Sequence, residues 1–253
     1  MSLLSSEVVH LALYPGYAAL ARTRGWLRPR VVERGRYEGA PLEALDAALA
    51  EPRWRGARLR VVVSNLLVRY AIVSPDATLA SAADELAVAD ARMRQIHGPH
   101  AGLDVRISEP LSGRPQVAAG IARDLLEGLR ARLARARLRL QTLEPHFVRA
   151  MALARPPAGG FWLASVEPGA LLLASADRAG WASVAVFPRA GDLAESLAAA
   201  LREARLLATR AEMPTTLHLH VTGEDAMPEG GAIHLDGVTV RRVLDRGGVV
   251  HGA

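Results

Sequence analysis

Few residues in this chain have types and spacings that could do chemistry. His218 and His220 alternate along one apolar run, so on a strand their imidazoles would share a face, a spacing that metal sites can use. The next acids are Glu224 and Asp225, and no Cys is present to complete a ligand set. With eight histidines in 253 residues such a pair is unsurprising, and we predict no metal site.

Composition excludes several kinds of catalysis. The chain has no Cys, which removes disulfides and thiolate nucleophiles. All 31 basic residues are arginine, so Schiff-base catalysis and the phosphate-binding lysine of a P-loop are also excluded. The sequence lacks both the Gly-x-Ser-x-Gly pattern of hydrolases and the Gly-x-Gly-x-x-Gly pattern of dinucleotide sites. We therefore predict no catalytic residues.

The net charge of +5 is mild, and the arginines are mostly interleaved with Asp and Glu. The densest stretch, 130–139, could contact anionic lipid, an acidic partner or nucleic acid. We interpret it as a solvated helix leading into an exposed strand, because its leucines commit the other side to packing. Exposed aromatic residues that could stack on bases are scarce, so we predict no nucleic-acid binding.

The elements that would position any site occur twice along the chain. Strand-like runs 8–13 and 17–23 flank Tyr14-Pro15-Gly16, where proline fixes φ and glycine permits the positive φ of a tight turn. Gly25-Trp26 forms a second break before a third strand-like run, 27–34. A helix that begins at Pro41 and a buried strand, 59–63, complete this first copy.

The second half of the chain repeats that order. Runs 161–166 and 170–176 flank Glu167-Pro168-Gly169, and Gly180-Trp181 precedes a third run. A helix with Asp192 as its N-cap and an apolar strand, 217–221, then follow. Four features recur in one order at an offset of about 155 residues, which indicates an internal duplication.

The segment between the copies has elements of its own. We predict a fourth strand of the first sheet at 69–73. The segment also contains three predicted helices, 81–96, 121–133 and 147–153, and two predicted strands, 103–108 and 137–143. The segment 155–160 contains two prolines and two glycines and is the best linker. We therefore predict a first lobe at 1–154, with an inserted subdomain at about 76–118, and a second lobe at 160–253.

This arrangement resembles the actin-like ATPase fold, a duplicated ribonuclease H-like α/β fold with two lobes and mixed sheets flanked by helices. Three stretches sharpen the resemblance, namely Val62–Val73, the helix with Glu85 to Gln95, and Leu138–Pro145. They resemble the degenerate actin-like proteins of type IV pilus and type II secretion platforms, the PilM-like and cytoplasmic GspL-like proteins. The resemblance covers most of the chain, from about Val8 to Leu235.

The resemblance also implies where a nucleotide would bind. Actin-like ATPases place an Asp-x-Gly at each hairpin turn, where the carboxylates hold Mg²⁺ and the glycine lets the backbone approach the phosphates. The corresponding residues here are Gly16 at the first turn and Glu167 and Gly169 at the second, with Gly223 after the late strand on the adenosine side. The first turn has no carboxylate, and each turn has a proline that lacks an N–H. We expect a vestigial nucleotide cleft without magnesium-dependent ATPase activity or a bound cofactor, although ATP binding stays open.

The resemblance implies a non-catalytic scaffold in the cytoplasm, at the inner face of the bacterial inner membrane. Its implied partners are a bitopic, PilN-like platform protein and a secretion ATPase, and membrane association would be peripheral and only through partners. A homodimer is also allowed. The alternative is a divergent, sugar-kinase-like phosphotransferase of the same fold that binds ATP, against which the missing carboxylate and the absence of lysine argue.

Overall fold

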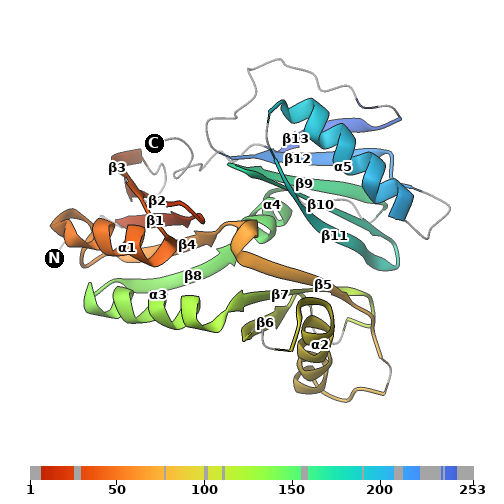
Figure 1. Ribbon diagram of the computed structural model, residues 1–253, viewed down its shortest axis with the longest axis horizontal. Coiled ribbons are helices and arrows are strands. Elements are labelled where there is room, and N and C mark those ends of the chain that lie inside the picture. Colours follow the sequence, from red (N-terminus) through yellow and green to blue (C-terminus); the bar gives the residue numbers. More distant parts are fainter. Residues whose placement is uncertain are drawn as a thin grey trace. The chain divides into compact units, whose positions relative to one another are not determined.

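The computed structural model describes residues 7–25, 30–76, 78–99, 102–109, 112–154, 159–189, 191–207, 213–222, 235 and 237–243. Within these ranges the chain has two compact units, one that includes residues 7–67 and 122–149 and one that includes 68–121 and 150–243. Figure 1 labels the helices and strands. No helix in the described ranges is both long and apolar enough to span a membrane.

A five-stranded mixed sheet forms the centre of the first unit, in the order β3-β2-β1-β4-β8. The strands β1, β2 and β3 pair antiparallel, whereas β4 pairs parallel with both β1 and β8. Their bounds are β1 Val8–Leu13, β2 Tyr17–Arg24, β3 Arg30–Glu38, β4 Arg58–Val63 and β8 Arg139–Pro145. The exposure of β3 alternates residue by residue, as expected of an edge strand with one solvated face.

Two helices of this unit pack against each other, α1 (Pro41–Ala50) and α3 (Arg123–Arg135). Gly128 on α3 allows the close approach, because a Cβ at this position would lie 2.6 Å from Cδ1 of Leu42 on α1. Short 3-10 turns follow α1 and β4, at Pro52–Trp54 and Asn65–Leu67. The helix α4 (His146–Ala154) follows β8 directly, and the backbone N–H of Phe147 donates to Oδ1 of the buried Asn65 at 3.1 Å.

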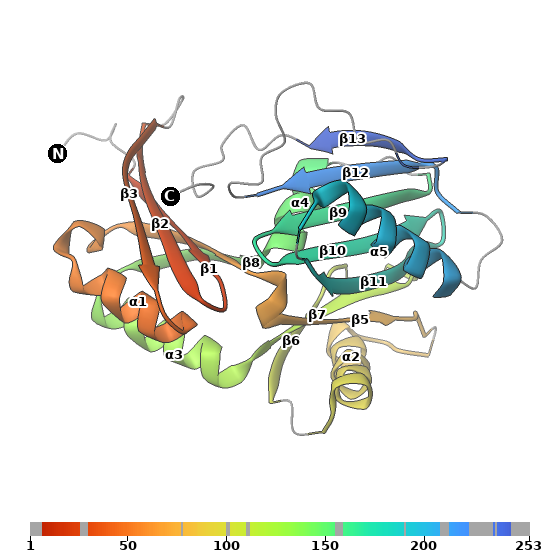
Figure 2. The ribbon, with the colours of Figure 1, turned by 45° about the horizontal axis from the view of Figure 1, so that its top comes forward.

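The C-terminal sheet repeats the strand order of the first, as β11-β10-β9-β12-β13. Again the first three strands pair antiparallel and the last two add in parallel. The bounds are β9 Phe161–Glu167, β10 Ala170–Asp177, β11 Gly180–Pro188, β12 Thr216–Val221 and β13 Thr239–Val243. Every residue of β9 is buried, and α5 (Leu193–Leu207) packs against the sheet (Figure 2). The predicted duplication is thus confirmed strand by strand.

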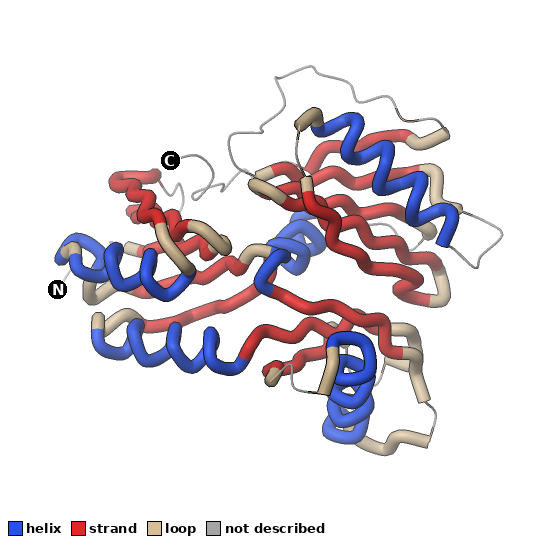
Figure 3. The backbone as a smooth tube through the Cα atoms, viewed as in Figure 1, coloured by secondary structure: helices blue, strands red, loops and turns tan. Residues whose placement is uncertain are grey.

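A third sheet, in the order β5-β7-β6, corrects one prediction. The run at 69–73 was expected to extend the first sheet, but β5 (Val68–Val73) pairs antiparallel with β7 (Gln116–Ala122) instead. The helix α2 (Ala82–His97) contacts β5 and β6 (Leu103–Ile107), and its buried Met93 and Ala89 join their core. Figure 3 distinguishes these strands from the helix. The 3-10 turn at Asn65–Leu67 separates β4 from β5, so the two strands belong to different sheets.

Other differences concern element limits. The prediction started the long helix at Ile121, but that residue belongs to β7, which ends at Ala122, and α3 begins at Arg123. Leu129 and Leu133 lie on the buried face of α3. Ser81 caps α2 by accepting a hydrogen bond from the N–H of Asp84 at 3.2 Å. Asp192 caps α5 as predicted, because its Oδ1 accepts from the N–H of Glu195 at 3.0 Å.

The predicted lobes at 1–154 and 160–253, with an insert at about 76–118, stay predictions. By compactness, residues 68–121 group with the C-terminal sheet and not with the N-terminal one. Trp26 of the repeated pattern and Gly223, the proposed adenosine-side residue, lie outside the described residues.

Candidate functional site at two equivalent turns

The first hairpin turn joins β1 to β2 through Pro15 and Gly16, both exposed. The N–H of Tyr14 donates to the carbonyl oxygen of Tyr17 at 2.9 Å, which closes the turn. From the end of β3, the N–H of Gly39 donates to the carbonyl oxygen of Gly16, also at 2.9 Å. The turn is therefore fixed by one hydrogen bond within it and by another from the residue that follows β3.

One expectation about this turn is wrong. Gly16 was predicted to adopt the positive φ that glycine permits, but it is not among the described glycines with positive φ. A Cβ added there would meet no heavy atom within 4 Å. Proline at the preceding position sets the turn without the help of a left-handed residue, so nothing in the backbone requires glycine here.

The second hairpin turn occupies the same place in the C-terminal sheet. Glu167 and Ala170 are paired across a two-residue turn of Pro168 and Gly169, and Gly169 has a φ of 76°. The N–H of Arg189, just after β11, donates to the carbonyl oxygen of Gly169 at 3.0 Å. This bond matches the one that Gly39 makes at the first turn.

A second matched pair of hydrogen bonds joins the strands beside the turns. The N–H of Ser64, just after β4, donates to the carbonyl oxygen of Leu13 at 2.8 Å. The N–H of Thr222, just after β12, donates to the carbonyl oxygen of Val166 at 2.9 Å. Both donors are buried hydroxyl residues that the sequence reasoning did not single out. Their shared position, directly after an apolar fourth strand, was the signal that could have found them.

Although the turns are equivalent, the residues at the strand ends before them are chemically different. In the first unit that residue is Tyr14, which is 3% exposed and stacks on Tyr17 with ring centroids 4.4 Å apart. The guanidinium of Arg36 lies over the other ring of this pair, 3.9 Å from the centroid of Tyr17. The ring of His146 lies 5.5 Å from that of Tyr14. An aromatic and cationic cluster thus occupies the first turn.

At the second turn the equivalent residue is Glu167, the last residue of β9, and it is fully buried. Its negative charge is felt by Tyr70 on β5, another buried residue of the same unit. Burial raises the pKa of the Tyr70 phenol well above its usual value, and the charge of Glu167 raises it further. Tyr70 therefore stays protonated at all physiological pH values.

We tested whether these residues fit the magnesium-bound nucleotide that the resemblance implies. Mg²⁺ takes hard oxygen ligands, usually carboxylates together with water and phosphate oxygens. The first turn offers a buried, stacked phenol in place of a carboxylate and does not fit. Among the described residues no group of three or more Asp, Glu or His side chains is placed to hold a metal ion. The assignment of Gly16, Glu167, Gly169 and Gly223 to a vestigial cleft stays a prediction.

Comparison with known proteins places the fold. No protein-family model matches the sequence, and no curated protein is significantly similar to it. Among solved structures, the PilM-PilN type IV pilus biogenesis complex matches with a TM-score of 0.62 at 16% identity, covering 97% of this chain and 90% of that one. The cytoplasmic domain of EpsL, from the type II secretion system of Vibrio cholerae, matches with a TM-score of 0.58 at 14% identity, covering 85% and 82%. A Bacteroides thetaiotaomicron protein with an actin-like ATPase fold and unknown function gives 0.56 at 12% identity, covering 86% and 82%.

The chain has an actin-like fold. In this fold the duplicated sheets bring equivalent residues to equivalent turns, as the hydrogen bonds above do here. The predicted fold class is therefore confirmed, and the difference between Tyr14 and Glu167 becomes the chief chemical asymmetry of the actin-like halves.

The histidine pair on β12 is part of the core of the actin-like C-terminal sheet. His218 and His220 are 7% and 0% exposed, and the ring of Phe161 meets that of His218 edge-on at 6.0 Å. Burial lowers the pKa of His218, and the positive charge of Arg241 on β13 lowers it further. His218 is therefore neutral near pH 7.

A groove of about 450 Å³ lies in the second unit of the actin-like fold. Its walls come from β10 and from two strands at sheet edges, β5 and β11, which contact each other, with further residues from β9, α2, α5 and the segment before β12. The lining is mainly apolar and includes Ile72, Val184, Phe187 and Met213. Sequence reasoning missed this groove, because it assigned β5 to the wrong sheet.

Proposed function

We propose that the protein is a non-catalytic scaffold subunit of an inner-membrane assembly platform for type IV pili or type II secretion. It binds a short cytoplasmic segment of a bitopic, PilN-like partner. The likeness of the fold to the PilM-PilN complex and to the cytoplasmic domain of EpsL supports this assignment. In this proposal the protein lies in the cytoplasm at the inner face of the membrane.

The observation that carries the non-catalytic part is the burial of Tyr14 at the first turn. Phosphoryl transfer depends on cations and on groups positioned around the phosphates. A phenol that is 3% exposed and stacked on Tyr17 offers no carboxylate to a metal ion, and the backbone N–H of Tyr14 is already donated to the carbonyl oxygen of Tyr17. The chain also lacks the lysine that many phosphate sites use.

The groove beside β5 and β11 supports the binding of a short extended segment. An extended peptide can pair with the backbone of an edge strand while alternate side chains enter pockets beside it. Both β5 and β11 lie at the edges of their sheets and contact each other, and the groove beside them is lined mainly by apolar side chains. We therefore assign the partner segment to this groove.

A secretion ATPase and a second copy of the chain are further partners within the proposal. The alternative function is a divergent phosphotransferase that binds ATP. One observation favours it, namely that the second turn retains a carboxylate, Glu167, beside a glycine with positive φ. Binding of magnesium and ATP separates the two functions, because only the phosphotransferase requires it.

The test uses the purified chain and a labelled synthetic peptide that copies the cytoplasmic segment of a single-span protein encoded beside it. We expect saturable binding by fluorescence anisotropy. Val184→Arg, which adds charge to the groove, should weaken binding about tenfold or more. Val32→Arg, at an exposed position on the equivalent edge strand β3, should leave binding unchanged.

Two results would contradict the proposal. The first is the absence of peptide binding in the unaltered protein, which would remove the scaffold function. The second is sub-millimolar binding of ATP with magnesium in calorimetry, together with turnover that is lost in Glu167→Gln. That outcome would favour the phosphotransferase.

A further inference from the structure

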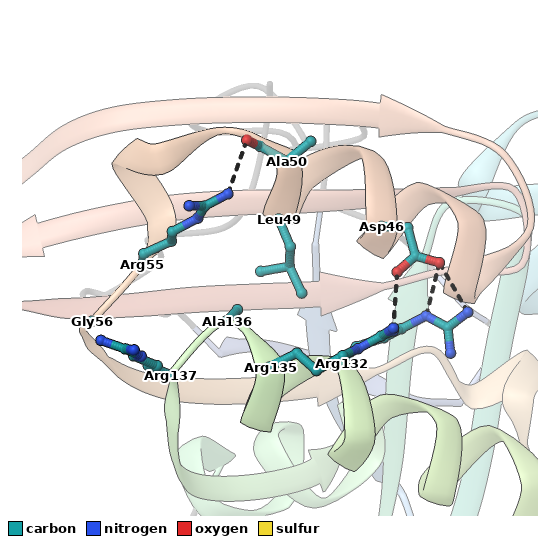
Figure 4. Close-up of a pocket in the computed structure, with 9 residues that line it drawn as sticks. All are labelled: Asp46, Leu49, Ala50, Arg55, Gly56, Arg132, Arg135, Ala136 and Arg137. Atoms are coloured by element: carbon teal, nitrogen blue, oxygen red, sulfur yellow. Dashed lines mark hydrogen bonds and ion pairs between the residues drawn. The ribbon is translucent and has the colours of Figure 1, made fainter.

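A second groove, in the first unit, carries an inference that does not depend on the proposed function. It has a volume of about 830 Å³ and lies where α1 and α3 both end. The side chains that line it are mostly charged, and the argument concerns Asp46, Leu49, Arg55, Arg132, Arg135 and Arg137 (Figure 4). Four arginines thus face one acid.

That acid is already neutralised. Nε and Nη2 of Arg132 each approach Oδ2 of Asp46 to 2.9 Å, and Nη2 of Arg135 lies 3.9 Å from Oδ1. At the other end of the groove, past Leu49, lie Arg55 and Arg137 (Figure 4). Nη2 of Arg55 donates to the carbonyl oxygen of Ala50 at 3.5 Å. Positive charge therefore remains without a counter-charge from the described residues that line the groove.

The sequence around the groove increases this charge. The segments 52–62 and 130–140 contain four and five arginines and no Asp or Glu, namely Arg53, Arg55, Arg58, Arg60, Arg130, Arg132, Arg135, Arg137 and Arg139. The structure brings the two segments together, because the N–H of Arg139 donates to the carbonyl oxygen of Ala57 at 3.1 Å. Arg58 and Arg139 are also register partners on β4 and β8. Arg53 is paired with Glu51, but the other arginines repel one another, and a bound anion would reduce this repulsion.

The backbone at Arg137 points in the same direction. The N–H groups of Arg137 and Leu138 donate to the carbonyl oxygens of Ala134 and Leu133, at 3.0 and 2.9 Å. This is the Schellman arrangement, in which the residue after the helix takes a left-handed conformation and is usually glycine. Arg137 has a φ of 56° and is the single non-glycine residue with positive φ in the described part of the chain. An arginine therefore stands where glycine would be more stable, which is understandable if its guanidinium is needed for binding.

We propose that this groove binds an acidic segment of a partner protein, with carboxylates meeting Arg55 and Arg137 and an apolar side chain resting on Leu49. Arginine recognises carboxylates through paired, charge-assisted hydrogen bonds. A concave site with a half-buried leucine suits a peptide better than a flat lipid surface. The residues that line it include no aromatic side chain on which bases of a nucleic acid could stack.

The probe for the test is a short fluorescein-labelled peptide rich in glutamate with one central leucine, compared with the same peptide containing glutamine in place of glutamate. The unaltered protein should bind the glutamate peptide, with an affinity that falls as salt is added, and should not bind the glutamine peptide. Arg55→Gln and Arg137→Gly should each weaken binding about tenfold. Arg202→Gln makes the same change of charge at an exposed position on α5 and should have no effect.

Arg137→Gly guards against loss of folding as an explanation, because glycine suits the backbone at this position and should make the protein more stable. The proposal is overturned if the unaltered protein does not bind the glutamate peptide, or if both groove variants bind it as well as Arg202→Gln does. Tighter binding to phosphatidylglycerol vesicles or to duplex DNA than to the peptide would also overturn it, in favour of a lipid or nucleic-acid surface.

Discussion

The backbone N–H and the hydroxyl of Thr222 both donate to the carbonyl oxygen of Val166, at 2.9 and 3.0 Å. These two hydrogen bonds fix the end of β12 to the end of β9, next to the second turn. Thr222 is 1% exposed, so water cannot replace the hydroxyl in Thr222→Val, whose side chain has nearly the same volume. We expect Thr222→Val to lower the free energy of unfolding by about 1 kcal/mol in urea denaturation. Thr239→Val, at an exposed position on β13, should change it little.

The two turn glycines should respond differently to the same substitution. Gly169 has a φ of 76°, so Gly169→Ala should lower the free energy of unfolding by about 1–2 kcal/mol. Gly16 lacks a positive φ and has open space around its Cα, so Gly16→Ala should be neutral or stabilise by about 0.5 kcal/mol. Equal losses in both variants would mean that the two turns share a conformation after all.

An aspartate, as in the Asp-x-Gly pattern that the resemblance implies, should not be tolerated at Tyr14. Tyr14→Asp removes the stack on Tyr17 and buries a carboxylate, so we expect a loss of about 3 kcal/mol or more in stability. Tyr14→Phe keeps the ring and should lose less than about 1.5 kcal/mol. Calorimetry should detect no gain of magnesium and ATP binding in either variant. A folded Tyr14→Asp protein that binds ATP would instead indicate that the phosphate site survives.

The repeated half of the fold was predictable because its signals are local. Pro15 and Pro168 mark equivalent turns, Asp192 has the chemistry of an N-cap, and the apolar runs have the lengths of strands. What could not be predicted depends on contacts between distant residues. Nothing near Val68 indicates that β5 pairs with β7, some 50 residues later, and not with β4. The basic groove could not be predicted for the same reason, because it depends on the contact between Arg139 and Ala57, which are far apart in the sequence.

The candidate site was likewise predictable where the signal is local and unpredictable where it depends on the fold. The lack of a carboxylate at the first turn was readable from Tyr14 itself. The burial of Glu167 was not, because a strand that ends in an acid usually exposes it. Ser64 and Thr222 were missed because a hydroxyl residue after a strand has many possible partners, and only the fold decides which carbonyl it meets.

Replacement of arginine by glycine should change stability in opposite directions at two positions near the end of α3. Arg137→Gly removes the backbone strain of an arginine in the left-handed conformation. It should raise the free energy of unfolding by about 0.5–1 kcal/mol, after allowance for the greater freedom of glycine in the unfolded chain. Arg135→Gly, in the last helical turn, should lower it by about 1 kcal/mol. Urea denaturation measures both. A loss of stability in Arg137→Gly would mean that the arginine side chain stabilises the fold by more than its backbone costs.

His218 should make stability depend on pH in mildly acidic solution. Burial and the charge of Arg241 lower its pKa in the folded protein below the usual value near 6.5, so the unfolded chain binds this proton more readily. Its contribution to stability is therefore complete above that value and is lost as the pH falls through the lowered pKa. Between pH 7 and pH 5, the melting temperature of the unaltered protein should fall more than that of His218→Gln. Glu7 acts in a separate, more acidic range, because hydrogen bonds from Arg24 and Arg22 lower its pKa. Parallel melting curves for the two proteins across the His218 range would show that this imidazole takes up its proton equally well in the folded and unfolded states.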